Sequence, residues 1–129
     1  PDEIINKYPL PKQSSSDIMD YLDDDLKKEL YSRRIKNKNI KWSSYKDCPF
    51  INKELIAEYM MLSGTGWYHK MYQIMVSIAK KAMLMNYPIT SHEIETLCRE
   101  LDSDTGNWYT KRPLGKEAER AIKFALSSL

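Results

Sequence analysis

The sequence predicts an all-α fold, a compact bundle of about five helices, and three observations support this prediction. Apolar residues recur three or four positions apart over most of the chain, which is the spacing of one helix face. Helix caps and turn-forming residues separate these segments. The strict apolar and polar alternation of a half-buried strand is missing; the short stretch 40–45 is the one place where a β-like segment is the alternative.

The first two predicted helices lie before residue 64. The segment 17–36 follows Ser16, a good N-cap, and its apolar residues stand four positions apart. The next apolar stripe begins after Asn52 and stops at Ser63 and Gly64. This spacing predicts a short second helix.

Three further helices are predicted in the second half of the chain. The segment 67–86 is the longest well-patterned one, and we expect it to be the central helix. Thr90 and Glu93 form a capping-box signature ahead of apolar residues that continue at helical spacing to Leu101. The last helix is expected from about Pro113, a residue that suits a first helical turn.

The length of 129 residues fits one domain with a single core. Residues 1–15 have the proline and serine content of a linker, so we expect the bundle to occupy 16–129. Because the chain starts at Pro1 rather than at a methionine, we interpret it as part of a longer polypeptide whose remainder would hold any catalysis.

Composition argues against several classes of protein. The apolar stretches are too short to span a membrane and the first residues lack a signal-peptide pattern, so we expect a cytoplasmic protein with no membrane partner. Cys48 and Cys98 have no metal-ligand spacing with His69 or His92, so no metal site is predicted.

A glycine-containing turn opens the predicted third helix. Thr65 and Gly66 precede an aromatic and basic first turn, which reads Trp67-Tyr68-His69-Lys70. Unpaired backbone N–H groups at a helix start favour an anion, and flat rings offer stacking faces for bases. The alternative is a capped helix start whose Trp67 and Tyr72 pack in the core.

The loop before the last helix and the first turns of that helix have similar side chains. These candidate binding residues are Trp108, Tyr109, Lys111, Arg112, Lys116 and Arg120. Cations such as Lys111 and Arg112 are disfavoured at a helix start, so a bound anion would resolve the conflict, and an acidic neighbour such as Glu117 would do so equally well. Trp108 has the alternative of a core anchor. In an antiparallel bundle the third and fifth helices start at the same end, which predicts one combined site.

The segment 31–46 is a second candidate, because its charged residues are all basic and aromatic residues lie among them. Its candidate binding residues are Arg33, Arg34, Lys41 and Trp42. Such a combination neutralises phosphates and stacks bases in single-strand binders. The alternative is a solvated helix end followed by a loop, in which the cations complement the helix dipole.

Catalytic interpretations fare poorly. The turn at 63–67 has neither the lysine nor the preceding strand of a Walker phosphate loop. The carboxylates of Asp23, Asp24 and Asp25 would point in different directions on a helix, which favours a solvated acidic face over the alternative of a magnesium site. We therefore expect neither ATPase nor polymerase activity from this chain alone.

Four motifs follow one another in the second half of the chain: Tyr-Pro-Ile-Thr-Ser-His-Glu-Ile at 87–94, Leu101-Asp102, Gly-Asn-Trp-Tyr-Thr-Lys-Arg at 106–112, and Lys-Glu-Ala-Glu-Arg-Ala-Ile-Lys-Phe-Ala at 116–125. This series resembles the helix bundle domain that follows the catalytic domain of archaeo-eukaryotic-type primase-polymerases of crenarchaeal plasmids and phages, and the resemblance covers about 52–125. It implies a partner primase domain in the same polypeptide, often followed by a helicase module. It also implies contacts with single-stranded template DNA and with the initiating nucleoside triphosphate, ATP or another, and Mg²⁺ only with that nucleotide.

A protein-interaction bundle is the alternative function. The chain has seven methionines, and methionine-rich surfaces repack readily against varied partners. Salt dependence distinguishes the two functions, because phosphate-driven binding weakens steeply with added salt and apolar docking does not.

Overall fold

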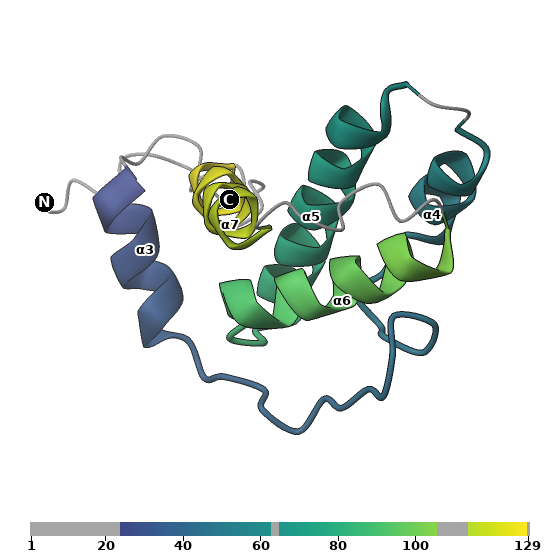
Figure 1. Ribbon diagram of the computed structural model, residues 1–129. Helices are drawn as coiled ribbons and strands as arrows, with labels where there is room; N and C mark the ends of the chain where they lie inside the picture. The colour runs from purple at the N-terminus through teal and green to yellow at the C-terminus, as the bar shows by residue number, and fades with distance from the viewer. Residues whose placement is uncertain (1–23, 63–64, 106–113, 129) are drawn as a thin grey trace, which may run out of the picture.

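The computed structural model describes residues 24–62, 65–105 and 114–128, and within these ranges it contains five helices and no strand. The helices are α3 (Asp24–Arg33), α4 (Lys53–Met60), α5 (Trp67–Leu84), α6 (Ser91–Asp104) and α7 (Gly115–Ser127). Figure 1 shows α7 between α3 and α5, with α4 on the far side of α5 and α6 crossing below them. The predicted all-α bundle of about five helices is confirmed.

The central helix α5 and the last helix α7 form the most extensive helix pair. On α5 the buried face is made of long side chains and two alanines: Met71, Ile74, Met75, Ile78, Ala79, Ala82 and Met83. On α7 it is made of three alanines: Ala118, Ala121 and Ala125. Small side chains on α7 let the two backbones approach closely, and the apolar area removed from water stabilises the pair.

Local chemistry sets the helix ends. The Asn52 carboxamide oxygen accepts hydrogen bonds from the backbone N–H groups of Glu54 and Leu55, which starts α4. The predicted capping box of Thr90 and Glu93 is present at the start of α6. At the end of α5, Asn86 adopts a left-handed conformation with φ of 58°, and the Tyr87 N–H donates to the Ala82 carbonyl at 2.8 Å.

Several predicted boundaries differ from the observed ones. The central helix ends at Leu84, two residues before the predicted end, because Asn86 turns the chain. The first helix ends at Arg33 rather than near Lys36, and its predicted start lies outside the described residues. The last helix begins at Gly115, and Pro113 also lies outside them.

The stretch 40–45 forms no strand, contrary to the β-like alternative. The backbone N–H groups of Ser43 and Ser44 donate to the Asp47 carboxylate at 3.1 and 2.8 Å. These N–H groups therefore stabilise a tight turn and do not form the hydrogen bonds of a β-ladder. Within the described ranges there is also no other strand to pair with it. The connection 34–52 runs past α6 from α3 to α4 (Figure 1).

Two buried polar contacts tie the outer helices to the centre. The Tyr59 hydroxyl of α4 donates to the Asp102 carboxylate of α6 at 3.0 Å, and both residues are almost fully buried. The buried Lys27 ammonium of α3 donates to the Ser127 carbonyl at 2.5 Å. That carbonyl lies at the C-terminal end of α7, where the helix dipole favours a cation.

Thr90→Ala should lower the free energy of unfolding by about 1 kcal/mol, because it removes the acceptor for the Glu93 N–H at the start of α6. Thr96→Ala is the matched control, since Thr96 is exposed within the same helix and alanine favours helix. Urea unfolding followed by circular dichroism measures both. Equal losses in the two variants would show that the capping box contributes nothing specific.

Candidate functional site

The starts of α5 and α7 lie side by side, as the bundle topology predicts. The Tyr68 hydroxyl of α5 donates to the Glu117 carboxylate of α7 at 3.0 Å. One turn further along both helices, the Arg120 guanidinium lies over the Tyr72 ring, 5.7 Å from its centroid. The two helices therefore run in the same direction, and their first turns form one continuous surface.

Some of the predicted binding residues at the start of α5 are exposed, and others pack against the rest of the protein. Thr65, Gly66 and His69 are exposed. Gly66 has a left-handed backbone with φ of 81°, which a residue with a side chain adopts only with strain. Trp67 is half-buried and packs against the hydrophobic core. Its ring therefore contributes to core packing, which is the alternative interpretation of this residue.

Lys70 forms an ion pair between helices. Its ammonium lies 2.6 Å from the Glu58 carboxylate of α4, and the Glu58 side chain is about half exposed. An ion pair with one exposed partner contributes little to stability, so a phosphate oxygen could replace the carboxylate at small cost. This pair could not be predicted from the sequence, because the two residues meet only through the packing of α4 on α5.

At the start of α7, Lys116 and Arg120 are exposed. Glu117 is the acid of the first turn, where it complements the helix dipole. Its Oε1 atom is buried and finds no hydrogen-bond partner among the described residues, whereas Oε2 accepts from Tyr68. The other predicted members of this site, Trp108, Tyr109, Lys111 and Arg112, lie outside the described residues.

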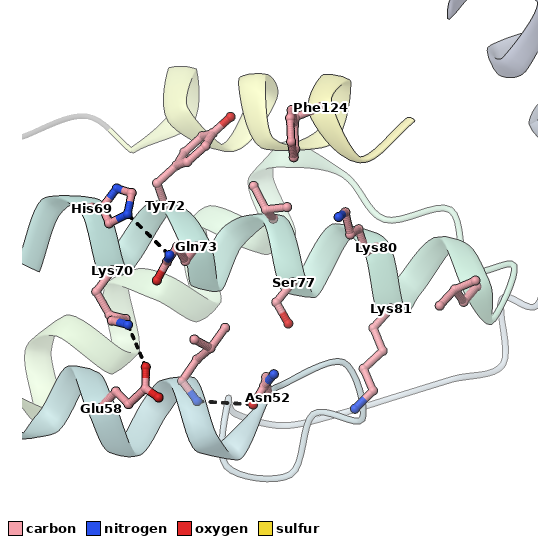
Figure 2. A pocket seen from close by; sticks show the side chains of 13 residues that line it. Asn52, Glu58, His69, Lys70, Tyr72, Gln73, Ser77, Lys80, Lys81 and Phe124 are labelled. Atoms are coloured by element: carbon pink, nitrogen blue, oxygen red, sulfur yellow. Dashed lines mark hydrogen bonds and ion pairs between the residues drawn. The ribbon is translucent and has the colours of Figure 1, made fainter. Parts of the chain in front are cut away.

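A surface groove of about 710 Å³ continues from this surface between α4, α5 and α7 (Figure 2). Leu55, Val76, Leu84 and Phe124 supply its apolar lining. Its polar lining residues are Asn52, Glu58, His69, Lys70, Tyr72, Gln73, Ser77, Lys80 and Lys81. At the seam between α5 and α7, the Lys80 ammonium lies 5.5 Å from the centroid of the Phe124 ring.

Sequence reasoning missed this groove. A signal for it exists, because His69, Gln73, Ser77, Lys80 and Leu84 recur at helical spacing beside the buried face of α5. Most of these residues are polar, which is the ordinary pattern of a solvated helix face. Only the positions of α4 and α7 turn that face into the floor of a groove.

In the second predicted patch, the Trp42 ring is held in an aromatic cluster. It makes edge contacts with Phe50 and with Tyr87, each with ring centroids 5.4 Å apart. Arg33 pairs with Glu29 at 2.5 Å, Arg34 is half-buried and Lys41 is exposed. Stacking of a base on Trp42 would thus compete with edge contacts that hold the 34–52 connection to the bundle.

Two tyrosines donate to carboxylates beside this connection. The Tyr87 hydroxyl donates to Glu93 at 2.6 Å, and the Tyr45 hydroxyl donates to Asp104 at 2.9 Å. Burial is the larger cause and the hydrogen bond to the carboxylate the next, and together they raise the pKa of both phenols to about 12. Both side chains are therefore fixed as neutral donors at physiological pH.

Neither a metal centre nor a membrane span is found in the described parts of the chain. No group of three or more His, Cys, Asp or Glu side chains among these residues could hold a metal ion. None of the described helices is both long and apolar enough to cross a bilayer. Comparisons with known protein families, with curated proteins and with solved structures found no match to this chain.

Trp67→Ala should lower the free energy of unfolding by about 2 kcal/mol, because a half-buried tryptophan loses part of the packing that a fully buried one provides. Tyr68→Phe is the control. It keeps the neighbouring ring and removes the surface hydrogen bond to Glu117, so it should cost less than about 1 kcal/mol. Thermal unfolding of both variants measures the difference, and an unchanged midpoint for Trp67→Ala would contradict the packing assigned to Trp67.

Tyr45 and Tyr87 should ionise late in an alkaline titration of the folded protein. Their folded pKa of about 12 lies above the ordinary value of 10.0, so the stability they contribute is present below that ordinary value and is lost as pH rises through the folded one. Phenolate absorbance follows the titration. Tyr45→Phe and Tyr87→Phe should each remove one late phenol, and in urea both phenols should titrate normally. Phenols that ionise early in the folded wild type would refute the assignment.

Proposed function

We propose that this chain is a nucleic-acid- and nucleotide-binding accessory domain of a DNA primase-polymerase. It engages single-stranded template DNA and the initiating nucleoside triphosphate, while a primase catalytic domain of the same polypeptide performs the transfer. In this proposal the protein acts in the cytoplasm and has no membrane partner. The motif series at 87–94, 101–102, 106–112 and 116–125 supports the proposal through its resemblance to that family.

The observation that carries the proposal is the juxtaposition of the two helix starts. The Tyr68 contact with Glu117 and the Arg120 contact with Tyr72 bring exposed cations and aromatic rings onto one surface. Phosphates are attracted by the cations and by the helix starts, and unpaired bases stack on rings. Lys70 adds a cation that can exchange Glu58 for a phosphate.

The nucleotide proposed for this surface is ATP or another nucleoside triphosphate. Any Mg²⁺ would arrive with the triphosphate, because Mg²⁺ in such sites is held largely by substrate phosphates and water. Lys116 and Arg120 are the described cations at the start of α7 that would face the phosphates. Hydrolysis is not part of the proposal, since the chain has no phosphate-loop lysine.

A protein-interaction bundle is the second candidate, and one observation favours it. Met60 and Met61 at the end of α4 are exposed, Met61 to 83%, and Leu84 at the end of α5 is also exposed. Exposed methionines adapt to varied apolar partners. The methionines at the end of α4 would dock a neighbouring domain or a replication partner with little dependence on salt.

The proposal predicts weak binding of single-stranded DNA that falls as salt rises, because one small basic surface contacts few phosphates. Arg120→Ala and Lys116→Ala should each weaken binding and reduce the steepness of the salt dependence by about one. Lys28→Ala, an exposed lysine of α3, is the matched control and should change neither.

Fluorescence anisotropy of a labelled oligothymidylate, with and without ATP, measures these effects. Absence of binding at low salt in both conditions would refute the proposal. Binding that is insensitive to salt would contradict phosphate contacts as its source.

A further inference from the structure

Two pairs of a cation and an aromatic ring lie where α5 and α7 meet, and the helix that supplies the cation differs between them. In the first, Arg120 of α7 lies over Tyr72 of α5; in the second, Lys80 of α5 lies over Phe124 of α7. Phe124 is 50% exposed, whereas the buried residues of α7 are alanines. An aromatic ring left half in water beside a groove is available for stacking.

The groove beside Phe124 has the size and the lining of a site for a flat, partly apolar group. Its volume of about 710 Å³ lies within the range of roughly 300–1,000 Å³ typical of small-ligand sites. Val76 and Leu84 line it together with the Phe124 ring. Nucleobases are flat groups of this kind, with apolar faces and polar edges.

The cations at the rim of the groove are available for phosphates. Lys80 and Lys81 are exposed, and neither takes part in an ion pair with another residue of the described ranges. In Figure 2 both lysines lie at the end of the groove away from Lys70. A strand along the groove would therefore meet cationic side chains at both of its ends.

A hydrogen-bonding side chain lines the same groove. The Gln73 amide nitrogen lies 3.3 Å from Nε2 of His69, while the Gln73 amide oxygen is buried and has no hydrogen-bond partner in the described part of the chain. A buried unpaired acceptor is unfavourable, and rotation of the carboxamide toward the groove would let it meet the donors and acceptors of a base edge.

We propose that this groove holds an unpaired base of the single-stranded template, stacked on Phe124, with Lys80 and Lys81 at the flanking phosphates. This inference rests on the proposed function and adds to it the residues that contact bases. It also supplies selectivity for single strands, because the bases of a duplex are already stacked on each other and cannot enter the groove.

The test compares an oligothymidylate with an abasic strand of the same length, which has the phosphates but no bases. Phe124→Leu should weaken binding of the oligothymidylate about fivefold or more, the range of one lost stacking contact, and leave binding of the abasic strand unchanged. Phe124→Tyr keeps the ring and should bind both strands like the wild type. Lys81→Ala should weaken both strands, because it removes a phosphate contact.

Several outcomes would overturn the inference. If the wild type binds the oligothymidylate and Phe124→Leu binds it equally well, the base site is wrong while the proposed function stands. Loss of ATP binding but not of strand binding in Phe124→Leu would assign the groove to the free nucleotide. Binding of a poly-glutamate peptide with the same dependence on Phe124 would assign it to an acidic protein segment. Absence of oligothymidylate binding by the wild type would remove both proposals.

Discussion

The close packing of α7 on α5 is the constraint on which the rest of this structure depends. Three alanines on α7 face the long buried side chains of α5, and their small size fixes the two helices in one register. The contacts of Tyr68 with Glu117, Tyr72 with Arg120, and Lys80 with Phe124 follow from that register. A larger residue at any of the three alanines would move all of these contacts together, because packed interiors shift as units.

The helices α4 and α6 pack around this pair and help to form the groove. The buried contact between Tyr59 and Asp102 joins α4 to α6, and both helices also pack on α5. Since α4 is held in this way, Glu58 reaches Lys70 and Leu55 closes one side of the groove. The groove therefore depends on this buried hydrogen bond between α4 and α6, in addition to the residues that line it.

Much of the fold could be predicted from the sequence, because its signals are local. The capping box at Thr90 and the apolar spacing of α5 lie within single segments and gave nearly correct helix positions. The side-by-side arrangement of the two helix starts followed from topology. The extent to which Trp67 is buried and the ion pair of Lys70 could not be predicted. Helical spacing tells which residues share one face of a helix, but it does not tell which neighbouring element covers that face. For the same reason the groove beside Phe124 was missed.

Because the candidate surface has charges of both signs, the proposals depend on base stacking as well as on phosphate contacts. Glu58 and Glu117 lie among its cations, and each already accepts a bond from Lys70 or Tyr68. Carboxylates at these positions reduce the attraction for phosphate, so electrostatics alone would give weak binding with little preference between single strands and duplexes. Stacking is independent of charge and requires unpaired bases. In the proposal, a surface with mixed charge would therefore select single strands mainly through its rings, and Phe124 is a more exposed groove ring than the half-buried Tyr72.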